Sequence, residues 1–275
     1  MTISTGSIAC MAVSALVSIA VPIALLIYFR RRYGAKVVPA LVGAAAFVVF
    51  AMGLEQIMHL LVLRPDANGT WLSAYPLGYM VYGSLAAGIF EETGRFLSFK
   101  LLRKRYGGIQ TALSYGVGHG GIEAILVGGV SMISTIATSV MFNGGNAAAL
   151  TSGPNAEVVA KQLQAIAETP SAMFLVAGAE RMFALTIHIA LSVIVFYSVY
   201  GKRRTWLYPA AILLHALIDA PAALGQVGVI TNVLALEGLV LFCAVALTLL
   251  AVYTNRKLKP MEAPAFEGGN AYEKV

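Results

Sequence analysis

Residues 90–99 read FEETGRFLSF and place Glu91, Glu92 and Arg95 in the middle of an apolar segment, residues 79–102. A charged side chain at the centre of a bilayer costs at least about 2.5 kcal/mol, even on the most lenient scales. Charged residues therefore persist at that depth mainly where they have a partner or a function. Three charges within five residues make this segment the first candidate for a functional site.

The composition is that of an integral membrane protein. Of the 275 residues, 59% are hydrophobic and 12% are charged, and the mean hydropathy is +0.79, whereas soluble domains carry about 25% charged residues. A spanning helix needs about 20 apolar residues, and no alternating segments of about ten residues indicate a β-barrel. We therefore expect an all-α polytopic membrane protein with seven spans, at residues 7–29, 37–62, 78–102, 109–140, 171–200, 206–224 and 228–254.

The basic residues predict the orientation of these spans. They gather in four clusters at span ends, and alternation of the spans brings all four to one side, whereas the other side holds Arg64 and Lys161. Because cytoplasmic loops carry an excess of Lys and Arg, we expect the N-terminus outside and the C-terminus inside, and no nucleic acid as a partner. The clusters are 30–32 with Lys36, Lys100 with 103–105, 202–204, and Arg256, Lys257 and Lys259.

The chain is expected to form one transmembrane domain, residues 1–259, in a prokaryotic cytoplasmic membrane. The polar connection 143–170 contains apolar residues at helical spacing, which predicts an outer loop with a short amphipathic helix. Residues 260–275 are predicted to be a disordered cytoplasmic tail.

Four spans carry a titratable residue at one depth. Counted from the nearest basic cluster, Glu92 and His215 lie 11 residues away, and His119 and His188 lie 14 residues away. At about 1.5 Å per residue, these offsets are about 16 to 21 Å, near the middle of a hydrocarbon core about 30 Å thick. The sequence therefore predicts one polar site near the midplane, formed by Glu91, Glu92, Arg95, His119, His188, His215 and Asp219.

Ion pairing is expected around this site. Arg95 follows Glu91 at i+4, so we expect it to neutralise that carboxylate. A second polar layer lies nearer the outer boundary, and for it structural ion pairing and cavity lining are equal alternatives. Its members are Glu55, Glu123, Glu180, Arg181 and Glu237.

The predicted site contains the groups that hydrolysis within a membrane requires. A Glu can take a proton from water, and imidazoles can orient that water or bind a metal that acidifies it. By ligand type the three midplane histidines suit zinc, with His119, His188 and His215 as metal ligands and Asp219 holding the last of them. The chain has no HExxH motif, so the metal-bound and the metal-free alternatives both stay open.

Four motifs in order carry a resemblance to a known family. They are EETGR at 91–95, YGVGH at 115–119, ERMFALTIHIALS at 180–192 and HALID at 215–219. Together they resemble the YhfC family of intramembrane proteases. Their order is also similar to that of the wider superfamily of CAAX-prenyl endopeptidases, PrsW-like site-1 proteases and the gamma-secretase scaffold subunit. The resemblance covers roughly residues 40–255.

The resemblance implies roles for individual residues. It makes Glu91 the base that activates water, His119 and His215 the partners of the water or metal, and Asp219 an orienting group. His188 matches the YhfC pattern rather than the broader one. CAAX proteases usually space their first motif EE-x-x-x-R and often carry Asn at the position of Asp219, and both departures count against prenyl-protein substrates.

The expected function is that of an intramembrane endopeptidase. Its substrate would be a membrane-embedded protein or peptide, held in contact with the lipid bilayer. One alternative is a non-catalytic scaffold that binds another membrane protein through the same polar cavity. Another is a proton- or metal-coupled transporter, for which buried Glu and His also serve. Transporters commonly show broken helices in both halves, whereas this sequence has one glycine-rich span, 109–140, so the transporter is the least favoured.

Overall fold

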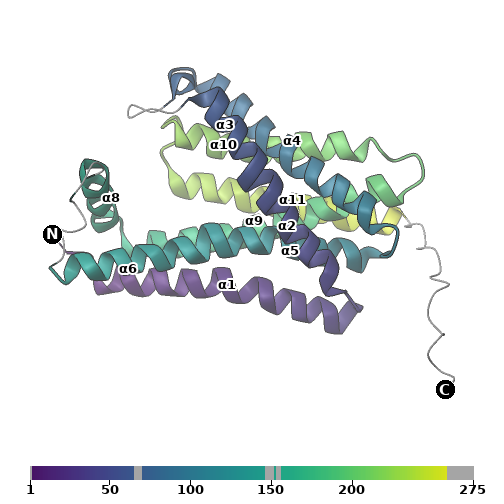
Figure 1. Cartoon of the computed structure of the whole chain (residues 1–275), viewed down its shortest axis with the longest axis horizontal. Coiled ribbons are helices and arrows are strands. Elements are labelled where there is room, and N and C mark those ends of the chain that lie inside the picture. Colours follow the sequence, from purple (N-terminus) through teal and green to yellow (C-terminus); the bar gives the residue numbers. More distant parts are fainter. Residues whose placement is uncertain (1, 65–69, 146–151, 153–155, 259–275) are drawn as a thin grey trace.

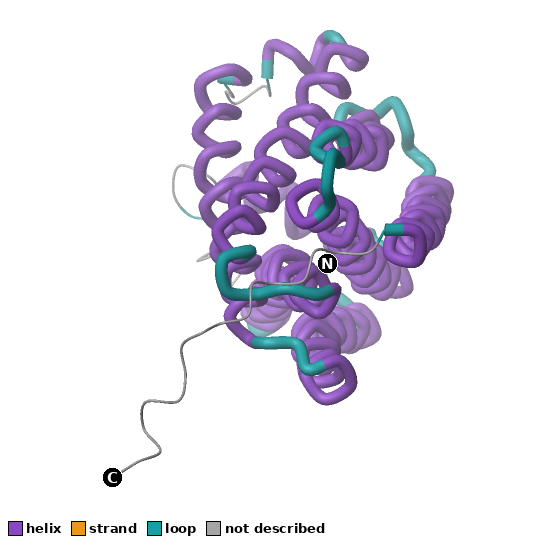
Figure 2. Tube along the Cα trace, turned by 90° about the vertical axis from the view of Figure 1, so that its right-hand side faces the viewer, coloured by secondary structure: helices purple, strands orange, loops and turns teal. Residues whose placement is uncertain are grey.

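The computed structural model describes residues 2–64, 70–145, 152 and 156–258, and these residues form helices and no strand. The expected all-α fold is therefore confirmed (Figure 1, Figure 2). The helices are α1 (Thr5–Tyr33), α2 (Val37–Val49), the π-helix η1 (Phe50–Glu55), α3 (Gln56–Leu63), the 3₁₀-helix η2 (Trp71–Ala74), α4 (Pro76–Leu102), α5 (Ile109–Glu123), the π-helix η3 (Ala124–Val130), α6 (Ser131–Asn143), α8 (Ala156–Glu168), α9 (Ser171–Tyr200), α10 (Leu207–Gln226) and α11 (Val233–Lys257).

Among the described residues, six helices or continuous helical runs are long and apolar enough to cross a membrane. They are residues 5–33, 37–63, 109–143, 171–200, 207–226 and 233–257. The seventh predicted span corresponds to α4, which packs against α10, α9 and α2 but carries the charged FEETGRFLSF stretch. The count of seven and the orientation of the termini stay predictions.

Helix α9 lies at the centre of the bundle. Of the 18 residues in its most apolar stretch 72% are buried, compared with 11% for α11, and α9 packs against α1, α4, α5, α10 and α11. The apolar core gathers around its C-terminal half, where Phe196 and Tyr197 are fully buried. Phe99 of α4 and Tyr115 of α5 pack there, with ring centroids 4.7 Å apart.

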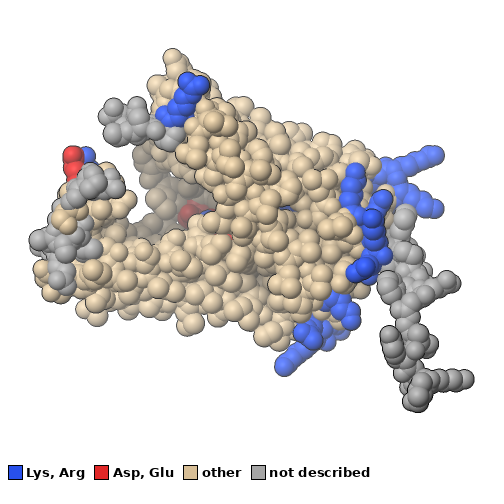
Figure 3. Space-filling model, in the orientation of Figure 1, with Lys and Arg blue, Asp and Glu red and all other residues tan. Residues whose placement is uncertain are grey.

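The two ends of the bundle differ. Lys and Arg side chains gather at the end of the bundle where α4 and α11 end (Figure 3). At the other end the helices form two groups. Helix α3 packs mainly on η1, whereas α6 packs on α1 and η3. Figure 1 shows α3 and α10 lying apart from α1 and α6 at this end.

The connection between α6 and α9 contains the helix α8. Its residue Leu163 is buried, whereas its residue Val158 is exposed. Parts of this connection, residues 146–151 and 153–155, lie outside the described residues, as does the predicted disordered tail, residues 260–275. The predicted single-domain organisation stays a prediction.

Candidate metal centre

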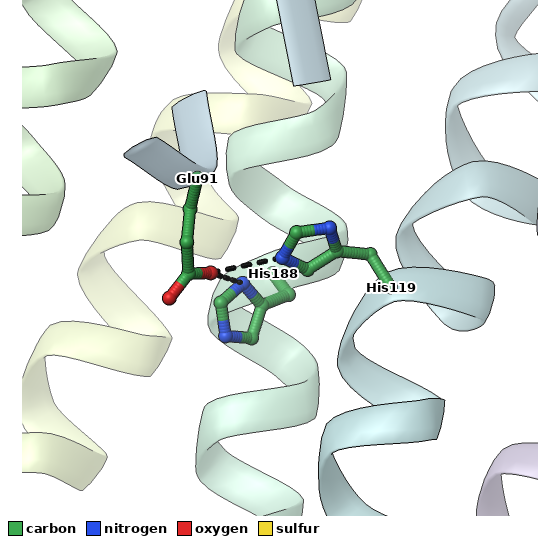
Figure 4. Close-up of side chains that lie close together, drawn as sticks. All are labelled: Glu91, His119 and His188. Atoms are coloured by element: carbon green, nitrogen blue, oxygen red, sulfur yellow. Dashed lines mark hydrogen bonds and ion pairs between the residues drawn. The ribbon is translucent and has the colours of Figure 1, made fainter. Parts of the chain in front are cut away.

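Three of the predicted site residues meet in the interior of the bundle. Glu91 comes from α4, His119 from α5 and His188 from α9, and their side chains point toward one another (Figure 4). Oε2 of Glu91 lies 2.9 Å from Nε2 of His119 and 3.7 Å from Nδ1 of His188. Each of the three residues is at least 92% buried, with exposed fractions of 8%, 0% and 5%. We call this trio the donor group.

Glycines allow the helices to bring these side chains together. A Cβ atom at Gly120 would lie 2.9 Å from Cβ of His188, closer than real Cβ atoms approach, so α5 and α9 can meet here only because the side chain is absent. On α4, a Cβ at Gly88 would lie 2.7 Å from the carbonyl oxygen of Ile212 in α10. Small residues let membrane helices approach closely, and here that approach places the donors within contact distance.

Arg95 holds one face of the donor group, but with a different partner from the one expected. Its Nη1 lies 3.4 Å from Oε1 of Glu92, one turn back on α4. Nη2 lies 3.0 Å from Nδ1 of His188, and Nη1 donates to the carbonyl oxygen of the same residue at 3.3 Å. The expected pairing with Glu91 is therefore not the one found, because Glu91 is turned toward His119. Positions i+3 and i+4 share a helix face, so spacing alone could not separate them.

His215 and Asp219 lie beside the donor group rather than in it. Nδ1 of His215 is 2.7 Å from Oε1 of Glu92, and Nε2 is 3.2 Å from Oδ2 of Asp219. Both ring nitrogens of His215 therefore already have a partner. The His215 ring nevertheless lies close to the donor group, with its centroid 5.5 Å from that of the His188 ring. Of the predicted metal ligands, the structure brings together His119 and His188, and the third donor of this group is Glu91.

The predicted second polar layer divides into two parts. Arg181 contacts Oε1 of Glu123 at 2.8 Å and also forms a bidentate ion pair with the neighbouring Glu180. Glu55 is separate from them and pairs with His59, whose other ring nitrogen lies 3.0 Å from the hydroxyl of Tyr82.

Glu123 also reaches the donor group, which the depth count did not predict. Its Oε2 lies 2.6 Å from Nε2 of His188. A signal was present in the sequence, because Glu123 follows His119 at i+4 and therefore lies on the same face of α5. The two predicted layers are thus joined through His188.

A cavity of about 450 Å³ connects the donor group with the end of the bundle opposite the basic clusters. Glu91, His188 and Asp219 line its inner part, while Tyr79 and Gln226 line its outer part and share a 2.9 Å hydrogen bond. Figure 3 shows this hollow from the side, with acidic side chains visible in its depth. A group inside the bundle can therefore be reached by water.

Two π-helices border this cavity. Glu55 is the last residue of η1, Glu123 directly precedes η3, and both line the cavity. π-Helical turns inside longer helices recur at functional sites. No residue pattern in the sequence indicated them.

The donor group fits a metal ion by chemistry and by spacing. Two imidazoles and one carboxylate are the protein ligands of a well-known class of catalytic zinc sites, with bonds of about 2.0 to 2.2 Å. In a tetrahedral arrangement such bonds separate neighbouring donors by about 3.3 Å. The two distances from Oε2 of Glu91, 2.9 and 3.7 Å, bracket that value, and all three donor atoms lie within 4.8 Å of one another.

Comparisons with known proteins agree with these motifs. A family model described as YhfC intramembrane metalloprotease matches residues 17–240. A protein of Bacillus subtilis (strain 168), named uncharacterized membrane protein YhfC, is 36% identical over 258 residues, which cover 94% of this chain and 98% of the relative. No solved structure matches the chain. The match spans the donor group and every helix that supplies it, and the chain belongs to the YhfC family of membrane proteins.

Proposed function

We propose that this protein is a metal-dependent intramembrane endopeptidase that cleaves a membrane-associated protein or peptide. The observation that carries the proposal is the buried donor group at the inner end of a cavity that water can enter. The description of the family as an intramembrane metalloprotease supports it.

Glu91, His119 and His188 would hold the metal ion, with zinc as the ion that these ligands suit best. A bound zinc ion acidifies a water molecule and polarises a carbonyl oxygen. Three protein ligands leave the fourth tetrahedral position for that water, as catalytic zinc sites do.

Of the two adjacent glutamates, Glu91 is the one that can take part in the chemistry. It lines the cavity, whereas Glu92 is fully buried and held by Arg95 and His215. Glu92 therefore positions its neighbours. Without a metal, the Glu91 carboxylate could still accept a proton from water, so Glu91 is essential under either form of the proposal.

Asp219 and His215 are placed to assist. The Asp219 side chain is 37% exposed and lies at the cavity, with one oxygen 3.2 Å from Nε2 of His215. This pair can pass a proton between the cavity and the buried Glu92.

The cavity also favours one direction of access. Its outer residues belong to the start of α4 and the end of α10, away from the basic clusters. The positive-inside rule assigns those clusters to the cytoplasm. Substrate would therefore reach the site from the outer half of the membrane.

The test compares cells that carry the wild type with cells that carry Glu91→Ala. New protein N-termini in the membrane fraction are quantified by mass spectrometry, and the zinc content of both purified proteins is measured. We expect cleavage products and about one zinc ion per chain in the wild type, and neither in the variant. Identical products from a folded Glu91→Ala protein would contradict the proposal. A partner protein that co-purifies equally with both, without any cleavage, would favour a scaffold.

A further inference from the structure

A groove of about 330 Å³ runs along α9, separate from the cavity that reaches the donor group. Its walls come from residues within 186–193 of α9, residues within 248–255 of α11, the start of α5 and the last residue of α1. These four helices belong to runs that are long and apolar enough to cross a membrane. On α9 and on α11 the lining covers two helical turns, about 10 Å. We call this hollow the α9 groove.

The body of the α9 groove is apolar. Most of its lining side chains are Ile, Leu, Val or Ala, and its two threonines already donate within their own helices. Thr186 donates to the carbonyl oxygen of Met182 at 2.8 Å, and Thr248 donates to that of Ala244 at 2.7 Å. An extended peptide in this groove would leave backbone groups without partners, which is costly in a membrane. A hydrocarbon chain has no such groups, so the lining favours an acyl chain.

One end of the α9 groove is polar and basic. Tyr33 lines it there, and the guanidinium carbon of Arg32 lies 5.5 Å from the centroid of the Tyr33 ring. Asn255 lines the same end and is followed by Arg256. Its Oδ1 accepts a 2.7 Å hydrogen bond from the hydroxyl of Tyr197, so the amide N–H groups are its donors to any ligand. This end therefore offers positive charge and hydrogen-bond donors, which suit a phosphate group.

The basic end decides which lipid the groove can select. An acyl chain gains little by moving from the bilayer into the groove, because lipid tails are as apolar as the side chains that line it. Selection must therefore come from the head group, and basic pockets between membrane helices bind anionic head groups. No Asp or Glu is among the described residues that line the groove, so nothing in its walls opposes a negative charge.

We propose that the α9 groove binds one anionic phospholipid, with an acyl chain between α9 and α11 and the phosphate beside Arg32 and Asn255. Ile189, which follows His188 in α9, lines the groove, so the lipid would pack on a helix that carries part of the donor group. The inference goes beyond the proposed function and needs neither zinc nor hydrolysis, so the two can fail separately.

The first experiment measures lipid retention by native mass spectrometry of the full-length protein in a neutral detergent. Dioleoyl phosphatidylglycerol and dioleoyl phosphatidylcholine are added in equal amounts, because they share their chains and differ in head-group charge. The wild type should retain one phosphatidylglycerol in preference to phosphatidylcholine by about fivefold or more, the factor expected from one Arg near an anionic head group. Equal retention of the two lipids would overturn the proposal.

The second experiment removes a charge at the basic end. Arg32→Gln should weaken retention of phosphatidylglycerol about fivefold and leave that of phosphatidylcholine unchanged. Lys100→Gln is the matched control, because its ammonium nitrogen lies 4.5 Å from the centroid of Phe96 on α4, a helix outside the groove walls. The control should change retention less than about twofold. Equal effects of the two variants would mean that the whole basic end attracts the lipid, which overturns the assignment to the groove.

The third experiment fills the groove. Val252 lines it and is 42% exposed, so Val252→Trp can place its ring in the groove without displacing the apolar core. Leu249→Trp adds the same ring to α11 at a position that is 65% exposed and outside the groove. Phosphatidylglycerol should raise the unfolding temperature of the wild type and of Leu249→Trp but not of Val252→Trp, because a ligand stabilises the state that binds it.

Two results of this third experiment would contradict the proposal. One is a folded Val252→Trp protein that retains phosphatidylglycerol like the wild type. The other is a wild-type dimer that carries no lipid and that Val252→Trp converts to a monomer, which would assign the groove to a second copy of the chain.

Discussion

The two halves of the bundle differ in packing: one is closed around aromatic side chains, and the other contains a polar cavity. At the basic end, α4, α5 and α9 close around aromatic rings, with Phe196 and Tyr200 stacked at a centroid distance of 4.1 Å. At the other end the helices separate around a polar cavity. The donor group lies between the two, on the same three helices, α4, α5 and α9. The packed half holds together the helices that carry the donor group, and the open half gives water a path to it.

Loss of a donor should give the largest effect. His188→Ala removes one of three donors and leaves Arg95 and Glu123 without their shared partner. We expect zinc affinity to fall at least about a hundredfold, beyond the loss seen for supporting residues. Elemental analysis and chelator competition on the purified protein measure it. The fold should survive, because the apolar core lies in the other half of the bundle. A folded His188→Ala protein that binds zinc like the wild type would show that the donor group does not hold the metal.

A change in the packed half should act on stability instead. Phe196→Ala truncates a fully buried ring, and such a substitution costs about 3 to 5 kcal/mol of unfolding free energy. Reversible unfolding in mixed micelles measures it. The control is Phe242→Ala on α11, where the ring is 68% exposed, and there we expect less than about 1 kcal/mol. Equal losses at the two positions would show that Phe196 does not contribute the stability expected of a buried core ring.

Gly120→Ala tests the boundary between the halves. The added Cβ would lie 2.9 Å from Cβ of His188, so we expect the imidazole to shift and zinc affinity to fall about tenfold, which is about 1.4 kcal/mol. Gly238→Ala on α11 is the control, because nothing lies within 4 Å of the added atom. If both variants bind zinc like the wild type, the close approach of α5 and α9 is not what positions His188.

The smallest effect is expected outside both halves. Lys161 and Glu157 on α8 form a 2.8 Å ion pair with exposed fractions of 74% and 83%. Exposed i,i+4 pairs on a helix contribute about 0.3 to 0.5 kcal/mol, so Lys161→Ala should leave zinc affinity unchanged and stability within about 0.5 kcal/mol. A larger change in either quantity would mean that α8 takes part in the site.

The sequence predicts the depth of a residue along its helix axis better than the direction in which its side chain points around that axis. Counting residues from the basic clusters gives depth, because helical rise is regular, and it correctly grouped His119 with His188. The same count could not tell which partner Arg95 would choose, because Glu91 and Glu92 both lie within one turn of it. Rotation about each axis decides such contacts, and it depends on packing with other helices.

The π-helices were beyond sequence reasoning for a related reason. Each inserts a wider turn into an otherwise continuous helix, at Phe50–Glu55 and at Ala124–Val130. Such a turn rotates every residue that follows it about the helix axis. A count that assumes regular α-helix therefore assigns those residues to the wrong face. The count to Glu55 runs through η1, whereas Glu123 precedes η3, and the two residues have different partners in the structure.

The donor group draws on residues 91, 119 and 188, so almost a hundred positions of chain separate the first donor from the last. While the protein is being synthesised, a chain inserted as far as α6 holds Glu91 and His119 but not yet His188. A nascent or truncated chain consequently has no complete centre. The donor group is complete only when α9 has been inserted and packed, so the proposed hydrolysis could not begin before that step.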